Sequence, residues 1–386
     1  MPDDTGSLIA EFHSRIADIP ATDWDACAGP SHPFVCHAFL KSLEDSGCAD
    51  GDSGWQPQHV TLKTPEDHAV LAAMPLYIKT HSYGEYVFDH AWAAAFERAG
   101  GRYYPKLQAS IPFTPVTGPR LLVRNPLDRP RLEPALLSAA MQLSEKVDLS
   151  SLHITFTETE QADRLAGLGL LRRTDQQFHW RNQGYDDFDD FLNALSSRKR
   201  KQIRKERRTA LGNGITIRHL RGAEITERHW DAFFRFYLDT GARKWGTPYL
   251  NRTFFSLIGD RMGDDILLFL CERDGQPVAG ALNFIGADTL YGRYWGCVED
   301  HPCLHFEACY YQAIDYAIAH GLNCVEAGAQ GPHKLARGYE PVMTHSLHWI
   351  ADPRFRAAVA QYLDHERREV ETEVAWLAEQ TPFKKS

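Results

Sequence analysis

Residues 186–214 predict an amphipathic helix with one apolar and one cationic side. At about 100° per residue the apolar residues fall within one arc of roughly 120°, as expected of a helix that packs against a core. These residues are Phe188, Phe191, Leu192, Leu195, Ile203 and Ala210. The Lys and Arg residues between 198 and 208 lie mostly on the opposite side. The helix is either a solvated surface element or a site for a polyanionic ligand, which would offset the repulsion among its cations.

Runs of apolar and aromatic residues separated by turn signals predict two β-meanders of similar sequence. The first comprises residues 60–62, 69–78 and 83–88, and the second comprises residues 265–271, 277–285 and 290–297. A gap-free alignment with an offset of 208 residues (278 minus 70) places Val70 on Val278 and Tyr83 on Tyr291. We therefore expect residues 69–88 and 277–296 to form equivalent strands.

A second alignment, with an offset of 169 residues (348 minus 179), places Phe178-His179-Trp180 on Leu347-His348-Trp349. It also places Gly169 on Gly338. Before each segment the pattern predicts an amphipathic helix and a short strand, at 132–146 and 152–156 in the first half and at 306–320 and 323–327 in the second. The two offsets differ by 39 residues (208 minus 169), which predicts an insertion at about 91–131 that projects from the first copy.

These patterns predict an α/β (α+β) fold built from two copies of one unit, with mixed sheets flanked by helices. We expect an N-terminal lobe at 1–185, which carries the insertion, and a C-terminal lobe at 186–386, which opens with the basic helix. The alternative is two unrelated α/β domains that share aromatic-rich strands. No Gly-x-Gly-x-x-Gly or Walker-type loop occurs, which argues against a dinucleotide-binding or P-loop enzyme.

The composition of the 386 residues is that of a globular protein, with 43% hydrophobic residues and a formal net charge of −9. Proteins that coat nucleic acid are usually basic, so we expect no DNA partner, and any polyanion site must be local. The eight cysteines include no Cys-x-x-Cys pair, which is typical of a reducing compartment. Neither a signal peptide nor an apolar run long enough to span a membrane is visible. We expect a cytoplasmic protein without an integral membrane segment.

Two motifs carry a family resemblance. The basic stretch has the form Arg-x-x-Ile-Arg-Lys at Arg200, Ile203, Arg204 and Lys205, and a Lys precedes an aromatic-containing Gly turn at Lys334, Gly338 and Tyr339. Further matching segments lie at 79–89, 103–107, 112–120 and 328–339. On these segments the chain resembles the GNAT acyltransferase superfamily, and within it the tandem Fem-type aminoacyl transferases. It is most similar to the bacterial family of predicted N-acyltransferases labelled peptidoglycan biosynthesis or recognition.

The resemblance implies two GNAT-like lobes with a site in the cleft between them. It implies an N-acyltransferase that moves an acyl or aminoacyl group to a primary amine, such as that of a cell-wall precursor, without a covalent enzyme intermediate. Acyl-CoA is the leading donor and aminoacyl-tRNA the competing one, and no tightly bound cofactor is expected. The alternative is a non-catalytic recognition module that binds an anionic cell-wall precursor or another metabolite.

The candidate catalytic residues lie in the second half of the chain. Lys334 follows a Gly-rich turn after a predicted strand, where a cation can stabilise the oxyanion of acyl transfer. His305 and Glu307 lie at the start of the helix predicted at 306–320, and either could accept the proton of the amine, although Glu307 could equally cap the helix. Nearby candidates for substrate binding are Gln330, His333 and Arg337, together with Arg200 and Arg204 of the basic helix. Cys309 is more simply a buried structural cysteine, and the His301, His305 and Glu307 spacing lacks a further ligand, so no metal site is expected.

Charged and aromatic residues also alternate in the first half of the chain. The candidates for substrate binding there are Lys79, His81, Tyr83, Glu85, Asp89, Tyr104 and Lys106. Strand alternation would place His81, Tyr83 and Glu85 on one face. The cluster predicts a pocket with aromatic walls and a charged floor, and the alternative is a packed strand whose polar groups are satisfied internally.

Overall fold

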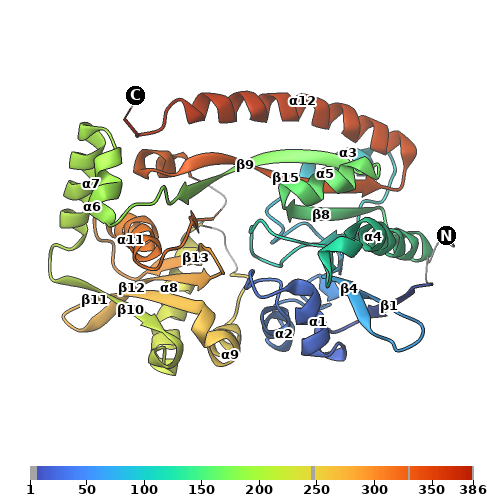
Figure 1. Cartoon of the computed structure of the whole chain (residues 1–386), viewed down its shortest axis with the longest axis horizontal. Helices are drawn as coiled ribbons and strands as arrows, with labels where there is room; N and C mark the ends of the chain where they lie inside the picture. Colours follow the sequence, from blue (N-terminus) through green and yellow to red (C-terminus); the bar gives the residue numbers. More distant parts are fainter. Residues whose placement is uncertain (1–6, 245–247, 329–330, 385–386) are drawn as a thin grey trace. The chain divides into compact units, whose positions relative to one another are not determined.

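The computed structural model describes residues 7–244, 248–328 and 331–384, and the chain divides into two compact units (Figure 1). The first unit contains the residues up to Asp175 and Thr344–Val370, and the second contains Gln176–Met343 and the residues from Glu371 onward. Both consist of mixed sheets flanked by helices, which confirms the predicted fold class. The division differs from the expected lobes at 1–185 and 186–386, because β15 (Glu340–Ile350) pairs with β8 (Ser151–Thr157) of the first unit.

The first unit contains two sheets. One has the strand order β1-β3-β4-β7, and the other contains β15, β8, β6, β5 and β2 as successive neighbours. Within the described residues, neighbouring strands of these sheets pair antiparallel, except β6 and β8, which are parallel. The remaining bounds are β1 (Ile9–His13), β2 (Trp55–Pro57), β3 (His59–Lys63), β4 (Val70–Met74), β5 (Tyr77–Lys79), β6 (Lys106–Ala109) and β7 (Leu122–Val123).

Helices supply the rest of the first core. They are α1 (Ala21–Ala28), α2 (His37–Asp45), α3 (His90–Arg98), α4 (Arg129–Lys146) and α5 (Thr159–Gly167), with short 3₁₀ turns at Ile16–Asp18 and Pro126–Asp128. The predicted helix at 132–146 is confirmed as α4, which buries Leu132, Leu136 and Ala140 at the four-residue spacing of one helix face. These residues share a core with Leu107 and Leu152 of the sheet. Helix α12 (Pro353–Ala378) begins in the first unit.

The second unit has one sheet, with the order β10-β11-β12-β13-β14-β9. Its strands are β9 (Leu171–Arg181), β10 (Ile215–Arg221), β11 (Ile266–Arg273), β12 (Gln276–Ile285), β13 (Thr289–Cys297) and β14 (Cys324–Glu326). Its helices are α6 (Phe188–Ala194), α7 (Ser197–Ala210), α8 (Glu227–Lys244), α9 (Arg252–Met262), α10 (Leu304–Phe306) and α11 (Gln312–Ala319). A π-helical turn, Glu307–Tyr311, joins α10 to α11, and 3₁₀ turns lie at Gly222–Glu224, Gly263–Asp265 and Pro332–Arg337.

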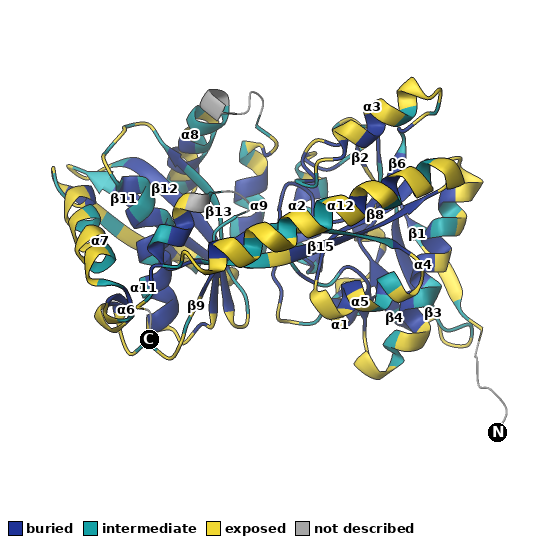
Figure 2. Cartoon of the chain, turned by 90° about the horizontal axis from the view of Figure 1, so that it is seen from above, coloured by how far each residue is buried: buried dark blue, intermediate teal, exposed yellow. Residues whose placement is uncertain are grey.

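The basic segment forms two helices instead of one. Ser196 leaves the helical conformation, with φ −57° and ψ 146°, and separates α6 from α7. All six residues of the predicted apolar stripe are nevertheless buried. Figure 2 shows α7 with a largely exposed outer surface, whereas β11 and β12 of the same unit are buried. The pattern therefore predicted the burial of each side chain correctly but missed the break in the backbone.

The offset of 169 residues agrees with the structure. It maps the first residue of β9, Leu171, onto the first residue of β15, Glu340, and the last residue, Arg181, onto Ile350. Gly169 and Gly338, which precede these strands, both have positive φ angles, of 91° and 87°. The short strands predicted at 152–156 and 323–327 are confirmed as β8 and β14.

The offset of 208 residues fails after β5. Residues 83–88 form no strand, because Gly84 (φ 80°) and Tyr86 (φ 59°) turn the chain, so Tyr83 is not equivalent to Tyr291 of β13. A Cβ atom on Gly84 would lie 2.6 Å from the Phe113 ring, which leaves glycine as the residue that fits. The counterpart of β13 is β6: β6 runs parallel to β8, and β13 runs parallel to β14.

The expected projecting insertion at 91–131 is also wrong. This segment contains β6, all four residues of which are buried between β5 and β8, and β7, which pairs with β4. A four-residue strand closely followed by prolines gives too short an alternation for the sequence pattern to show. In the part of the chain that the structure describes, no helix is long and apolar enough to cross a membrane.

If β6 is an internal strand, its apolar face must contribute to stability. Leu107→Ala is expected to lower the free energy of unfolding by about 2–5 kcal/mol, because Leu107 is fully buried and its truncation leaves a cavity. Glu97→Ala, on the exposed side of α3 in the same segment, should change it by less than about 0.5 kcal/mol. Urea unfolding of both variants measures the difference, and equal small effects would restore the insertion hypothesis.

Candidate functional site

One face of the larger sheet of the first unit is both polar and buried. Register pairs Lys79 with Lys106 across β5 and β6, Gln108 with His153 across β6 and β8, and His153 with His348 of β15. Paired residues project to the same side of a sheet, so these side chains share one face, together with Ser151 and Thr155 of β8. All seven are buried. The alternate residues, including Leu107, Leu152 and Leu347, belong to the apolar core on the opposite face.

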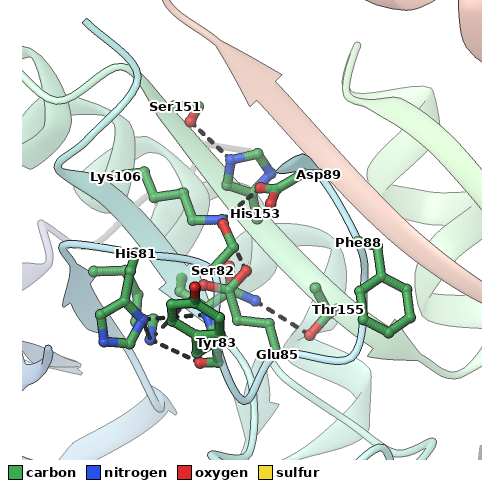
Figure 3. A network of polar contacts seen from close by, with 12 residues as sticks. His81, Ser82, Tyr83, Glu85, Phe88, Asp89, Lys106, Ser151, His153 and Thr155 are labelled. Atoms are coloured by element: carbon green, nitrogen blue, oxygen red, sulfur yellow. Dashed lines mark hydrogen bonds and ion pairs between the residues drawn. The ribbon is translucent and has the colours of Figure 1, made fainter. Parts of the chain in front are cut away.

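The segment 80–89 covers this polar face and brings two carboxylates to it (Figure 3). Lys106 Nζ donates hydrogen bonds to Ser82 Oγ at 2.8 Å, Glu85 Oε2 at 2.8 Å and Asp89 Oδ2 at 2.5 Å. Tyr103 donates to Asp89 Oδ2 at 2.7 Å from the side. The three protons of the Lys106 ammonium therefore have three oxygen acceptors, which is the arrangement that a buried charge requires.

Lys79 has a weaker set of partners than Lys106. Its ammonium lies 3.7 Å from the centroid of the Trp55 ring and donates to the Tyr83 carbonyl oxygen at 3.2 Å. Glu85 Oε1 lies 3.9 Å from it, beyond hydrogen-bond distance. The cation–π contact with Trp55 compensates part of the lost hydration.

The ionisation of these groups follows from burial and from their neighbours. Burial lowers the pKa of Lys79 to about 7 and raises that of Glu85 to about 7, with Lys106 opposing the latter shift. Burial also opposes the charges of Lys106 and Asp89, but attraction to opposite charges outweighs it. Glu85 and Asp89 raise the pKa of Lys106, and Lys106 lowers that of Asp89. Burial, followed by repulsion from Lys106, lowers the pKa of His153 to about 3. The face thus holds two groups that stay charged, Lys106 and Asp89. Beside them lie Lys79 and Glu85, which can exchange protons near neutral pH.

Several buried polar atoms of this face lack a hydrogen-bond partner among the residues that the structure describes. They are Trp55 Nε1, Tyr77 Oη, Glu85 Oε1, Asp89 Oδ1, Gln108 Oε1, Ser110 Oγ and His348 Nε2. A buried polar atom without a partner costs free energy, and such atoms are rare in native proteins. Their concentration on one sheet face indicates a binding site for a polar ligand.

The sequence found part of this cluster. Of the predicted substrate-binding residues, Lys79, Glu85, Asp89 and Lys106 converge, and Tyr104 reaches them through Ser82, whose Oγ lies 2.8 Å from Tyr104 Oη. The strand alternation expected for 81–85 is wrong, because a turn replaces the strand. His81 Nε2 therefore contacts the Ser53 carbonyl oxygen at 3.0 Å, and Tyr83 is 61% exposed.

Sequence reasoning missed the sheet floor of the site. The missed residues of the sheet are Trp55, Tyr77, Gln108, Ser151, His153, Thr155 and His348, and Ser82 of the covering segment was missed as well. A signal was present in Ser151-Leu152-His153-Ile154-Thr155-Phe156-Thr157, which alternates strictly between polar and apolar residues. Such alternation normally marks a strand with one face in solvent, and here the polar face is buried instead.

The second unit places Lys334 and Arg337 in the 3₁₀ turn Pro332–Arg337, after β14. Lys334 is 1% exposed, and its ammonium donates to the Gly328 carbonyl oxygen at 2.7 Å. Burial, followed by repulsion from Arg293, lowers the pKa of Lys334 to about 7. Arg337 donates to the His333 carbonyl oxygen at 2.7 Å and to Glu206 Oε2 at 3.1 Å, and its guanidinium lies 3.5 Å from the centroid of the Phe306 ring.

Glu307 opens the π-helical turn and is fully buried. Both of its oxygens accept from Arg207 Nε, at 3.1 and 3.2 Å, and Oε1 also accepts from Gln312 at 2.7 Å. Burial raises the pKa of Glu307, and Arg207 opposes that shift. These contacts favour a role in anchoring α7, although π-helical turns are often found at functional sites.

The other predicted residues of this unit have different surroundings. His305 lies among the rings of Trp295, Phe306 and Tyr310, and His333 Nε2 lies 2.8 Å from Tyr310 Oη. On α7, Arg204 pairs with Asp189 and Arg200 contacts Asn193, both near the surface. The predicted residue Gln330 lies outside the described residues. Within the described ranges no group of three His, Cys, Asp or Glu residues is placed to hold a metal ion.

The sequence matches the FemAB-like family model, described as peptidoglycan biosynthesis/recognition, over residues 15–385. The chain belongs to this family. A comparison with curated proteins finds no match. The match covers both units, so the polar face of the first and the Lys334 region of the second lie within one FemAB-like chain.

Solved structures show the same architecture as this FemAB-like chain. FemX has a TM-score of 0.55 and 12% identity, over 92% of this chain and 100% of FemX. The C-terminal domain of a putative lysylphosphatidylglycerol synthetase from Agrobacterium fabrum has a TM-score of 0.54 and 10% identity, over 89% of this chain and 95% of that domain. A tandem GNAT protein from the clavulanic acid biosynthesis pathway has a TM-score of 0.48 and 14% identity, over 90% and 99%. FemX and the Agrobacterium fabrum domain therefore show the fold of this chain.

The ion cluster of the FemAB-like chain can be tested through stability. Lys106→Met is expected to lower the free energy of unfolding by about 3–5 kcal/mol, because it leaves Glu85 and Asp89 buried without their cation. Adding Glu85→Gln and Asp89→Asn should restore most of the loss, since no uncompensated charge then remains.

The matched control for this stability test is the exposed ion pair Arg102–Asp148. Arg102→Met should cost less than about 1 kcal/mol, as is typical of surface pairs. Urea unfolding curves of the four proteins give the comparison. Equal losses for Lys106→Met and Arg102→Met would show that the buried cluster does not hold the sheet face together.

Proposed function

We propose that this protein is an N-acyltransferase that moves an acyl or aminoacyl group from an activated donor to a primary amine, in the chemistry of cell-wall precursors. Membership of the FemAB-like family and the FemX-like fold support the reaction class. The observation that carries the proposal is Lys334, a buried ammonium in the 3₁₀ turn that follows β14, with its pKa lowered to about 7. Such a group is costly to bury, so its position calls for a function.

In the proposed reaction the neutral amine attacks the carbonyl carbon of a thioester or ester. The carbonyl oxygen becomes an oxyanion in the tetrahedral intermediate, and protonated Lys334 stabilises that charge. When the intermediate collapses, the new C–N bond is kept and the C–S or C–O bond to the leaving group breaks. The leaving group takes a proton that the amine gives up. His305 and Glu307 stay candidates for accepting a proton; the Arg207 contacts of Glu307 make His305 the better of the two.

The donor is proposed to be acyl-CoA, with aminoacyl-tRNA as the alternative. Both carry phosphates, and α7 presents exposed cations at Arg198, Lys201, Arg204, Lys205 and Arg208. These side chains point to solvent while Ile203 and Ala210 of the same helix are buried. A phosphate-bearing ligand would relieve the repulsion among the cations.

The role of Lys334 can be tested by kinetics with acyl-CoA and primary amines as substrates. Lys334→Met is expected to lower kcat by roughly 10²-fold, the scale of losing one oxyanion-stabilising donor, with donor affinity within a few fold. Because the protonated form is required, kcat/KM should fall as pH rises through about 7, and Lys334→Arg should move that fall to higher pH. Lys146→Met, at an exposed lysine of α4, is the control and should leave kcat unchanged.

Other results with Lys334 variants would change the proposal. A higher dissociation constant for the donor with unchanged kcat would assign Lys334 to donor phosphates. Absence of transfer with all acyl-CoA and aminoacyl-tRNA donors would favour the recognition module instead.

The donor-binding role of α7 is tested by charge reversal. Arg200→Glu with Arg204→Glu should weaken binding of coenzyme A at least tenfold at low salt and reduce the salt dependence of the affinity, because fewer counterions are released. The unfolding free energy should change little, since the Arg204–Asp189 pair is exposed. Fluorescence or calorimetric titration at several salt concentrations measures both affinities. Unaltered affinity together with a large loss of stability would make α7 a structural helix.

A further inference from the structure

We propose that the buried polar face of the first unit is a binding site for a primary ammonium group, with Glu85 as the acceptor of its proton. The geometry of this unit is the evidence for the binding site. The proton-acceptor role rests on the proposed function and deepens it, because an amine must lose a proton before it attacks an acyl group. It assigns to Glu85, in place of His305 or Glu307, the removal of that proton.

The free acceptor atoms favour an ammonium ligand. Glu85 Oε1, Asp89 Oδ1 and Gln108 Oε1 are buried acceptor oxygens without a hydrogen-bond partner within the described ranges. Glu85 and Asp89 are close together because both bind Lys106 Nζ through their other oxygens. Gln108 follows Lys106 on the same face of β6. A primary ammonium has three N–H donors, which matches three acceptors of which two are carboxylate oxygens.

Other classes of ligand fit this face less well. The three protons of Lys106 are already taken by Ser82, Glu85 and Asp89. An anion would therefore have to be held by Lys79 and would be repelled by the two carboxylates. A divalent cation would meet Lys106 between the two carboxylates and be repelled by it. An ammonium carries a single charge and can lie against aromatic rings, as Lys79 lies against Trp55.

The segment 80–89 controls access to the face. It has no helix or strand between Lys79 and His90, and it supplies Ser82, Glu85 and Asp89 to the cluster. Its outer surface carries Tyr83 and Phe88, which are 61% and 55% exposed. Entry of an amine therefore requires this segment to move away from β6, and the charge of the amine draws the two carboxylates back.

Glu85 is placed to take the proton. The titratable groups that interact with it are Lys79 on β5, Lys106 on β6, and Asp89, Tyr103 and Tyr104 on the segments between. His153 on β8 and His348 on β15 lie on the same sheet face, and His81 lies beside Lys79. Burial raises the pKa of Glu85 to about 7, so its carboxylate is a competent base near neutral pH. In the transfer, the ammonium nitrogen gives one proton to Glu85 and then forms the N–C bond. The acyl C–S or C–O bond breaks, the leaving group takes the second proton, and Glu85 releases its proton to solvent.

The experiment is calorimetric titration of the full chain with n-butylammonium as the probe. n-Butanol and butyltrimethylammonium are the matched ligands, since the first lacks the charge and the second lacks N–H donors. The primary ammonium is expected to bind at least tenfold more tightly than either. Its affinity should rise with pH through about 7, because Glu85 must be ionised, and titration near that pH should release protons, measured in buffers of different ionisation enthalpy.

Glu85→Gln should weaken butylammonium binding at least tenfold and abolish the proton release. Gln108→Leu should weaken binding several fold and keep the proton release. If Glu85→Gln does not fold, the affinity of Gln108→Leu tests whether the polar face binds the ammonium group. Glu97→Gln, at an exposed carboxylate of α3, is the matched control and should bind as the unaltered chain does. Equal binding of the three ligands, or wild-type affinity in Glu85→Gln or in Gln108→Leu, overturns the proposal.

This test separates the site from the proposed function. Glu85-dependent binding of butylammonium without acyl transfer from any donor would keep the ammonium site and remove the transferase. Acyl transfer with an unchanged pH profile in Glu85→Gln would keep the transferase and remove Glu85 as the proton acceptor.

Discussion

The buried charge of Lys106 is the constraint on which the first unit depends. An ammonium without water must be paired, and the sheet around it supplies no carboxylate. The pairing comes from Glu85 and Asp89, which reach Lys106 because residues 83–88 turn at Gly84 and Tyr86. If residues 83–88 formed a strand, Glu85 and Asp89 would not both reach Lys106. The ion cluster thus explains why the repeat breaks down here and why β6 takes the place that the aromatic segment was expected to fill.

The number of partners decides how each buried lysine behaves. Lys106 has three oxygen acceptors and keeps its charge, with a raised pKa. Lys79 and Lys334 are nearly as buried, but each donates a hydrogen bond to a backbone carbonyl oxygen and to no carboxylate among the described residues. Burial lowers the pKa of each to about 7. The first lysine is therefore suited to holding structure, and the other two to reactions in which charge or protons change near neutral pH.

Helix α7 divides its charges between two tasks within the second unit. Glu206 and Arg207 face inward, where they bind Arg337 of the 3₁₀ turn and Glu307 of the π-helical turn. Arg204 and Lys205 face outward and are exposed. The inward pairs fix the two turns that carry the predicted catalytic residues Lys334 and Glu307, and the outward cations stay available to an anionic ligand.

The sequence by itself determined the α/β class, the 169-residue repeat of β9 and β15, the buried stripe of α6 and α7, and four converging charges of the polar face. Each of these depends on local periodicity or on residue type, which the sequence states directly. The turn at 83–88, the internal place of β6 and the floor made by Gln108, His153 and His348 were decided only by the tertiary structure. A polar strand face shows the same alternation whether water or another segment covers it, and only the fold decides which of them does.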